Sequence, residues 1–217
     1  FERALAIVPD HLGAAKPLSD IEFRREGYER AEQLLEVVVE KLDPGKDTKE
    51  LCRQYYRLGY ITEKQGKDQK ALKNYQRAYD IDPTYLPALE GLGGSLMKTE
   101  RWEDAQKIYQ TILIHHRESL TDAEVVDYYW KLGDIGDKVN QPERAIRNLE
   151  KALEIDSNNV PSLKLLADVH IKAGKFEEAY DALHKLGTLT NGDERVELLM
   201  RTGQLSKEKL VDPYRAI

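Results

Sequence analysis

Large apolar and small residues recur along this chain in one pattern that predicts pairs of amphipathic helices. In four segments a large residue is followed three positions later by leucine and then by a small residue, and an alanine comes twelve positions after that small residue. Spacings of three and four place side chains on one face of a helix, so the pattern predicts an all-α protein. The leucine and small residue of the four segments are Leu58 and Gly59, Leu92 and Gly93, Leu132 and Gly133, and Leu166 and Ala167.

The alanines that follow define the period of the repeat. Ala31, Ala71, Ala105, Ala145 and Ala179 are separated by 40, 34, 40 and 34 residues, so the full repeating unit is 74 residues long. A period between 20 and 50 residues for the single repeat predicts a stacked array of helix pairs rather than a globular core. The residues that recur at a distance of 74 are Tyr55, Leu58, Gly59, Ile61, Lys64, Ala71 and Asn74, matched by Tyr129, Leu132, Gly133, Ile135, Lys138, Ala145 and Asn148.

This pattern resembles the tetratricopeptide repeat, a helix-turn-helix module of 34 residues. One repeat has every residue of the family's pattern of a bulky residue, Leu, Gly, Ala, an aromatic residue, Ala and Pro: Tyr55, Leu58, Gly59, Ala71, Tyr75, Ala78 and Pro83. In later repeats the proline is replaced by Arg117, Ser157 and Asn191. The resemblance implies an all-α, right-handed superhelical solenoid of antiparallel helix pairs, which we expect to span residues 1–217 as a single domain.

The repeat boundaries follow from this alignment. Phe1, Ala4 and Pro9 have the family's spacing for the end of a second helix, so the chain opens inside a repeat and we expect a longer array. The expected parts are the end of a truncated repeat (1–9), a degenerate repeat (11–42), four repeats (48–82, 84–116, 122–155 and 158–188) and a C-terminal capping segment (192–217).

Three local features refine the expected helices. Pro17 should kink the first helix of the degenerate repeat or delay its start. The two insertions that lengthen alternate repeats end in Asp47 with Glu50 and in Thr121 with Glu124, each of which reads as a capping box. Alternate first helices should therefore begin about one turn early.

Charge and composition exclude several classes of partner. The net charge of −6 and the sequence pI near 5.5 argue against binding to nucleic acid. The longest apolar stretch, at 34–39, is far shorter than the about 18 residues of a membrane-spanning helix, so no direct membrane insertion is expected. The single Cys52 excludes an internal disulfide. No signal-like start is present, which favours a cytoplasmic location, although we expect the natural N-terminus and any targeting peptide on it to lie upstream.

The segment GLGGSL, at 91–96, raises the question of a phosphate-binding loop. A dinucleotide fingerprint needs a glycine at its sixth position after a strand, but Leu96 stands there and no strand precedes it. Gly93 instead occupies the small position of the repeat. Gly91 and Gly94 have no such explanation, and Gly94 indicates either a widened groove or a loose helix.

No combination of residues is typical of an active site, so we expect no enzyme activity, no cofactor and no metal. His115 and His116 are adjacent and point to different faces of a helix, which suits neither a metal nor a catalytic pair. His170 occupies an inward-packing position, and Cys52 has no base nearby in the sequence, so both are interpreted as structural.

Binding is the better-supported prediction. In the family the first helices line a concave surface that holds an extended peptide or a partner's helix. Tyr56, Tyr60 and Trp130 are candidate aromatic anchors, with packing between first helices as the alternative. The positions that the resemblance places on this surface are Tyr56, Tyr60, Glu63, Glu90, Gly94, Met97, Trp130, Asp134, Asp137, Lys164, Asp168 and Ile171.

Two further patterns bear on the partner. The Lys and Asn clamp of chaperone-binding members is absent, because its positions hold Tyr56 with Tyr60, Glu90 with Gly94, Trp130 with Asp134, and Lys164 with Asp168. A lysine recurs at one position as Lys64, Lys98, Lys138 and Lys172, which is either a basic ladder for an acidic partner or a structural habit of the family.

We therefore predict a non-catalytic protein-protein interaction scaffold that binds a peptide or helical segment of a protein partner in its concave groove. The alternative is the substrate-recognition arm of a larger enzyme, similar to that of the O-linked N-acetylglucosamine transferases. Self-association through the terminal repeats is a third possibility. The sequence names neither the partner nor the pathway.

Overall fold

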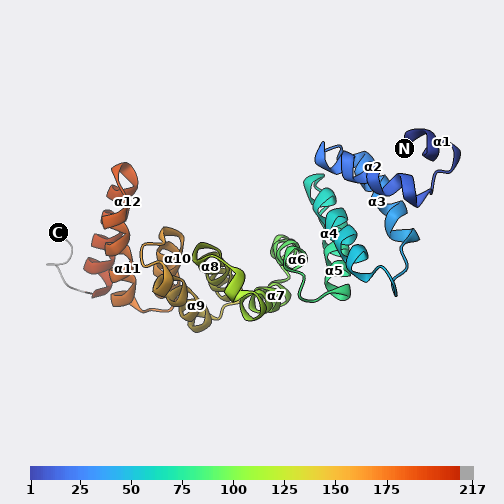
Figure 1. The fold of residues 1–217 in the computed structure, drawn as a ribbon. Coiled ribbons are helices and arrows are strands. Elements are labelled where there is room, and N and C mark those ends of the chain that lie inside the picture. Colours follow the sequence, from blue (N-terminus) through green and yellow to red (C-terminus); the bar gives the residue numbers. More distant parts are fainter. Residues whose placement is uncertain (211–217) are drawn as a thin grey trace. The chain divides into compact units, whose positions relative to one another are not determined.

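The computed structural model describes residues 1–210, which form helices and turns with no strand among them. The helices follow one another along the chain as pairs, and within each of the two compact units neighbouring helices pack on one another (Figure 1). The chain divides into two compact units, one from Phe1 to His115 and one from His116 onward, and each is described here by itself.

The first unit holds seven α-helices, and residues 116–210 of the second hold five with two short turns of other helix types. The first contains α1 (Glu2–Ile7), α2 (Leu12–Arg24), α3 (Tyr28–Lys41), α4 (Thr48–Lys64), α5 (Asp68–Ile81), α6 (Leu86–Lys98) and α7 (Trp102–His115). The second contains the 3-10 turn η1 (Arg117–Ser119), α8 (Asp122–Lys138), α9 (Pro142–Ile155), α10 (Val160–Lys172), α11 (Phe176–Leu189), α12 (Gly192–Leu205) and the π-helical turn η2 (Ser206–Leu210).

The helix bounds confirm the 74-residue period. Each of α4, α5, α6 and α7 begins and ends 74 residues before its counterpart among α8, α9, α10 and α11. The expected early start of alternate first helices is also confirmed, because α4 and α8 have 17 residues whereas α6 and α10 have 13.

A residue with positive φ lies in the turn between the first and second helix of each pair. The turn residues are Glu26, Gly66, Glu100, Asn140 and Gly174, at intervals of 40, 34, 40 and 34 residues. A left-handed residue after a helix lets the next N–H reach back to the last turn, as Lys67 N–H does to the Thr62 carbonyl at 2.8 Å. Gly66 and Gly174 therefore form turns between two helices, and the Gly-Lys pairs that they begin belong to these turns.

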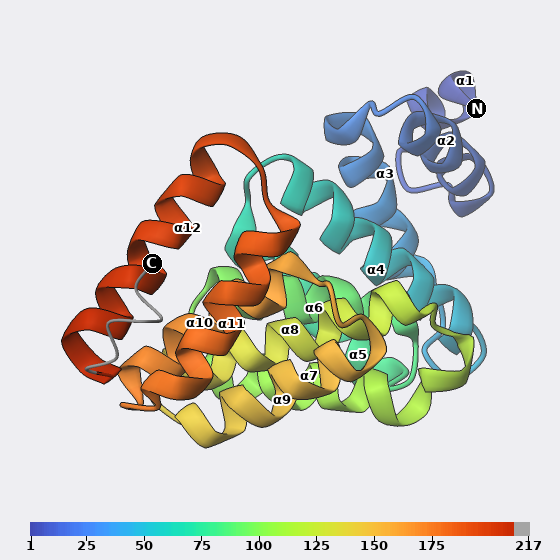
Figure 2. The same ribbon diagram turned by 90° about the vertical axis from the view of Figure 1, so that its left-hand side faces the viewer.

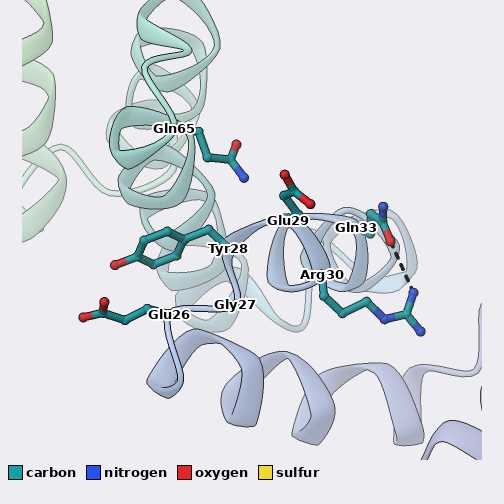
Figure 3. Close-up of a pocket in the computed structure, with 7 residues that line it drawn as sticks. All are labelled: Glu26, Gly27, Tyr28, Glu29, Arg30, Gln33 and Gln65. Atoms are coloured by element: carbon teal, nitrogen blue, oxygen red, sulfur yellow. Dashed lines mark hydrogen bonds between the residues drawn. The ribbon is translucent and has the colours of Figure 1, made fainter.

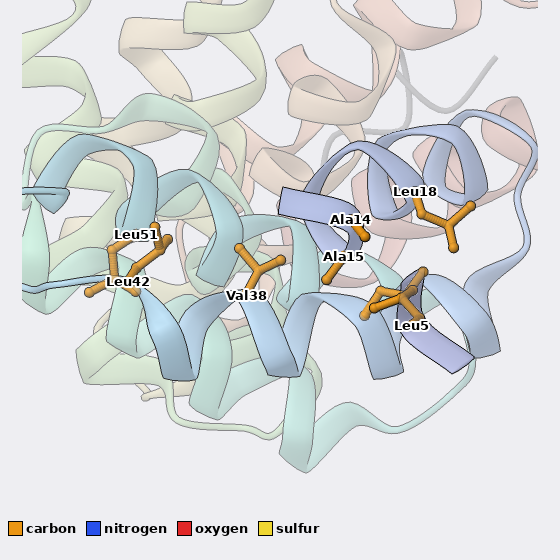
Figure 4. Packing of buried hydrophobic residues seen from close by; sticks show 8 residues of the cluster. Leu5, Ala14, Ala15, Leu18, Val38, Leu42 and Leu51 are labelled. Atoms are coloured by element: carbon orange, nitrogen blue, oxygen red, sulfur yellow. The ribbon is translucent and has the colours of Figure 1, made fainter. Parts of the chain in front are cut away.

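Cohesion comes from contacts between helices that are neighbours in the chain. The alanines that define the period, Ala31, Ala71, Ala105, Ala145 and Ala179, are fully buried. One buried cluster joins α1, α2 and α3 to the start of α4 (Figure 4). Leu5, Leu18 and Val38 belong to it, from three different helices. Such stacking of neighbours stabilises an array without a central nucleus.

The delayed start that was one alternative for Pro17 is wrong, because α2 begins at Leu12 and continues through the proline to Arg24. The first of the two predicted capping boxes is also wrong. Asp47 does not form a capping box, because its side chain accepts the Asp43 N–H at 3.1 Å. Glu50 instead contacts Lys16 at 3.1 Å.

The other predicted capping box is confirmed. Thr121 precedes α8 with extended backbone, and its hydroxyl accepts the Glu124 N–H at 3.3 Å. The Glu124 carboxylate accepts the Thr121 N–H at 2.8 Å. Two of the first amides of α8 are thereby satisfied.

Helix α12 packs against the last complete helix pair, as both views of the ribbon show (Figures 1 and 2). Its Leu198 and Leu205 join the buried cluster that contains Leu183 and Leu186 of α11. The expected capping segment extends to residue 217, and its last seven residues lie outside the described residues.

Glu32 is a buried carboxylate of the first unit. Its side chain is 8% exposed, with Lys67 Nζ at 2.8 Å and Lys70 also paired to it. Burial raises the pKa of Glu32, but the hydrogen bonds from the two lysines outweigh this, and the net pKa lies below the ordinary value of 4.5. The ionised carboxylate is therefore favoured by folding.

Replacing Glu32 with glutamine is expected to cost the first unit about 1–2 kcal/mol at pH 7, because two charge-assisted hydrogen bonds are lost. The folded pKa is lowered, so this contribution is complete above pH 4.5 and disappears as pH falls through the folded pKa. Urea unfolding of both proteins between pH 3 and 7 measures the difference.

Glu36→Gln is the matched control for that change. Glu36 also pairs with Lys70, at 2.7 Å, but its side chain is 50% exposed. An exposed pair contributes about 0–1 kcal/mol, so this variant should stay close to the parent protein. Equal losses in the two variants, or a Glu32 effect that does not decline as the pH falls below 4.5, would contradict the assignment.

Candidate functional site

The twelve positions predicted to face a partner, called the inner face from here on, all lie on first helices and are at least partly exposed. Glu90 and Lys164 are exposed, and the other ten are intermediate. The structure places them on α4 and α6 in the first unit and on α8 and α10 in the second. Continuity of the face between the two units stays a prediction.

The two tyrosines of the inner face on α4 pack within the first unit. Tyr56 lies 6.1 Å from the Tyr75 ring and meets the Tyr85 ring edge-on at 5.8 Å, both measured between centroids. The rings of Tyr60 and Phe23 lie 5.7 Å apart between centroids. Lys64 Nζ lies over the Tyr60 ring, 5.3 Å from the ring centroid. Both tyrosines therefore support the stack while keeping part of each ring exposed.

Two lysines of the predicted ladder connect successive first helices. Lys98 of α6 pairs with Glu63 of α4 at 2.5 Å, and Lys172 of α10 pairs with Asp137 of α8 at 2.6 Å. Each lysine stands 35 residues after its carboxylate. The repeated lysine therefore has a structural role at these two positions, since it neutralises a carboxylate of the inner face in the preceding repeat.

The remaining charges of the inner face in the second unit differ in their surroundings. Asp168 pairs with Arg201 at 2.5 Å, and Lys164 pairs with Glu194, so both contact α12. Burial raises the pKa of Asp134, and Asp137 adds to that effect. No hydrogen bond or ion pair to the Asp134 side chain occurs among the described residues.

Trp130 lines a pocket in the second unit. Its ring packs against the buried cluster of Ile146, Leu149 and Leu166, and its indole N–H is buried without a hydrogen-bond partner among the described residues. The pocket has a volume of about 290 Å³ and lies between α8 and the start of α10. Its lining residues are Ala123, Val126, Asp127, Trp130, Asn159 and Pro161.

The glycine cluster of α6 makes room for tyrosines of the neighbouring second helices. A Cβ on Gly91 would lie 2.3 Å from the Tyr75 ring, and one on Gly93 would lie 2.9 Å from the Tyr109 ring. A Cβ on Gly94 would meet nothing within 4 Å. Gly91 is thus explained by packing that the sequence analysis missed, whereas Gly94 opens space on the inner face.

A second concave site lies at the turn between α2 and α3, beside the C-terminal end of α4 (Figure 3). Its volume is about 630 Å³, and Arg30 hydrogen-bonds Gln33 at 3.2 Å within it. None of the predicted positions lines it, and no motif pointed to it. Its lining residues are Glu26, Gly27, Tyr28, Glu29, Arg30, Gln33 and Gln65.

Comparison with protein families settles what the repeat is. Models described as tetratricopeptide repeat match residues 54–85, 85–158 and 138–202. The chain belongs to the tetratricopeptide repeat family.

Two curated relatives share part of this sequence. The DnaJ homolog subfamily C member 7 homolog of Schizosaccharomyces pombe is 25% identical over 166 residues, which cover 70% of this chain and 34% of that protein. Regulatory protein RapD of Bacillus subtilis is 31% identical over 93 residues, covering 40% of this chain and 26% of RapD. The chain thus spans about a third or less of the length of either relative.

Solved structures with low sequence identity share the fold. A tetratricopeptide repeat protein from Parabacteroides merdae superposes with a TM-score of 0.69 at 20% identity, covering 94% of this chain and 75% of that one. MamA from Desulfovibrio magneticus RS-1 gives 0.64 at 20% identity, covering 82% and 94%. The fold is therefore the helical solenoid of tetratricopeptide proteins.

The residues considered for chemistry serve this repeat as structural groups. Cys52 is buried, donates to the Ala78 carbonyl at 3.4 Å, and has its pKa raised by burial to about 11. A thiol with that pKa is a poor nucleophile at neutral pH. His170 is 5% exposed, and burial lowers its pKa, so it stays a neutral core histidine.

Two further features are absent from residues 1–210. No group of three His, Cys, Asp or Glu side chains there could hold a metal ion. No helix in the same range has the length and apolar character needed to cross a membrane.

Proposed function

We propose that this chain is a non-catalytic protein-protein interaction scaffold, and that the inner face binds a peptide or helical segment of a partner. The tetratricopeptide repeat supports protein binding in general. The observation that carries the finer proposal is the division of α4, α6, α8 and α10: one side of each helix buries the repeat's leucine and small residue, and the other presents partly or fully exposed side chains, which include charged residues on all four helices and aromatic residues on α4 and α8. Aromatic groups of this kind supply contact area at little entropic cost.

The partner should be a protein segment with mixed polar and apolar character. The inner face holds five carboxylates and one ammonium, but two of the carboxylates, Glu63 and Asp137, already pair with lysines of the next repeat. The charge open to a partner is therefore modest. Contact area from rings and Met97 should contribute more than net attraction.

Charge reversal at exposed inner positions tests this proposal without replacing a buried residue, and Lys164→Glu also removes the half-exposed pair with Glu194 of α12. Glu90 of α6 and Lys164 of α10 are exposed, one in each unit. Glu90→Arg with Lys164→Glu leaves the total charge unchanged, and we expect at least a tenfold loss of the main partner captured from a lysate of the source cell. Quantitative mass spectrometry of the captured proteins measures the loss.

The matched control makes the same exchange on second helices. Lys107 of α7 and Glu150 of α9 are exposed, again one in each unit. Lys107→Glu with Glu150→Arg should retain the partner. If the Glu90→Arg, Lys164→Glu protein retained the partner and the Lys107→Glu, Glu150→Arg protein lost it, the partner would bind the second helices. That result would overturn the proposal.

A further inference from the structure

The pocket beside Trp130 lies at a position of the second unit whose counterpart in the first unit, 74 residues earlier, holds an aromatic ring. Helices α8 and α10 repeat α4 and α6 at a distance of 74 residues, so Trp130 corresponds to Tyr56 and Asn159 corresponds to Tyr85. The backbone before the two helices is the same, with φ and ψ of −72° and 100° at Tyr85 and of −63° and 100° at Asn159. At this position the backbone is kept, and the side chain changes from tyrosine to asparagine.

In the first unit the tyrosine at this position fills the space next to its partner ring. The Tyr85 ring meets Tyr56 edge-on with centroids 5.8 Å apart, at an interplanar angle of 89°. It packs beside the buried Cys52, Ala78 and Ala88. Burial raises the pKa of Tyr85, in agreement with its enclosed position.

In the second unit the shorter side chain leaves that space open. Asn159 turns to its own backbone, where its side-chain oxygen accepts the Ser162 N–H at 3.0 Å and caps α10. Val126 and Pro161, which line the pocket, correspond to Cys52 and Pro87 of the first unit. The pocket of about 290 Å³ therefore shares with the Tyr85 site the wall at Cys52 or Val126 and the neighbouring ring of Tyr56 or Trp130, and it lacks a ring at position 159.

We propose that this pocket receives an aromatic side chain of the bound partner, which stacks edge-on against Trp130 as Tyr85 does against Tyr56. A cavity of about 150 Å³ is already enough for benzene, so a single ring fits here. Aliphatic side chains would fill the volume but would not gain the edge-to-face contact with the indole. The pocket is thus the anchor point of the second unit, and this inference rests on the proposed function.

Small probes test the pocket without knowledge of the partner. The chain has two tryptophans, Trp102 and Trp130, so its two indole N–H signals in a ¹H–¹⁵N spectrum can be assigned with a Trp102→Phe variant. Titration with 4-methylphenol should shift the Trp130 signal saturably, with a dissociation constant on the order of 1 mM for so small a ligand. The non-planar 4-methylcyclohexanol should bind at least tenfold more weakly.

Asn159→Tyr supplies the missing ring from the chain itself. It should abolish the response of Trp130 to 4-methylphenol, whereas Asn158→Tyr, which adds the same ring at an exposed neighbouring position, should leave the response intact. The proposal fails if the parent protein shows no saturable shift at Trp130, if both probes bind equally, or if the folded Asn159→Tyr protein still responds.

The probe titration and the partner capture fail separately. Loss of probe binding would remove the aromatic anchor while leaving the scaffold proposal to the charge-reversal experiment. If the probe binds at Trp130 but the Glu90→Arg, Lys164→Glu protein still captures the partner, the pocket exists and the proposed binding of the partner to the inner face is wrong.

Discussion

Replacement of Leu198 by alanine is expected to destabilise the second unit by about 2–4 kcal/mol. Leu198 is 8% exposed and packs in the cluster that Leu183 and Leu186 of α11 share with α12. Truncation leaves a cavity at the surface where α12 packs against α11. Urea unfolding followed by circular dichroism measures the loss.

Met200→Ala is the control on the same helix. Met200 stands two residues away and is 71% exposed, beside the exposed Val196 and Leu199. A truncation there should change stability by no more than about 0.5 kcal/mol. If the two variants lost equal stability, or if Leu198→Ala were neutral, α12 would not serve as the cover of the second unit.

Replacement of Gly91 by alanine is expected to destabilise the first unit by about 2 kcal/mol. The new Cβ would lie 2.3 Å from the Tyr75 ring, which is 1% exposed and which a Cβ on Gly59 would also approach to 2.5 Å. The ring cannot move away, because it is packed between α4 and α6, so the cost of overpacking exceeds the gain of about 1 kcal/mol from alanine in a helix. Melting and urea unfolding both report this change.

Gly94→Ala should have the opposite sign. A Cβ on Gly94 meets nothing within 4 Å, so only the helix preference remains, and the variant should gain about 0.5–1 kcal/mol. A double-mutant cycle with Tyr75→Leu adds a further check, because the smaller side chain should relieve part of the Gly91→Ala loss. Additive effects in that cycle would show that the ring is not the cause.

The helix pairs and their order could be predicted from the sequence because each repeat packs mainly against its neighbours. The leucine, the small residue and the alanine of one repeat report the contacts of that repeat alone, so the period of 34 and 40 residues is visible without any long-range information. The buried Ala71, Ala105 and Ala145 and the longer α4 and α8 follow directly from it.

Side-chain choices between alternatives of similar energy could not be predicted in the same way. Asp47 and Thr121 have the same capping pattern, yet Asp47 bonds to Asp43 while Thr121 bonds to Glu124. Glu50, the expected partner of Asp47, contacts Lys16 of another repeat. A competing partner from a distant part of the chain decides such a case.

The sequence by itself determined the repeat, its period and the fold. Only the tertiary structure decided why Gly91 is a glycine and why a pocket opens at Trp130 and not at Tyr56. Both depend on one ring reaching across from a different helix, Tyr75 to α6 in one case and Tyr85 to α4 in the other. Whether such a ring fills a space is a matter of volume between helices, which the pattern along one helix does not encode.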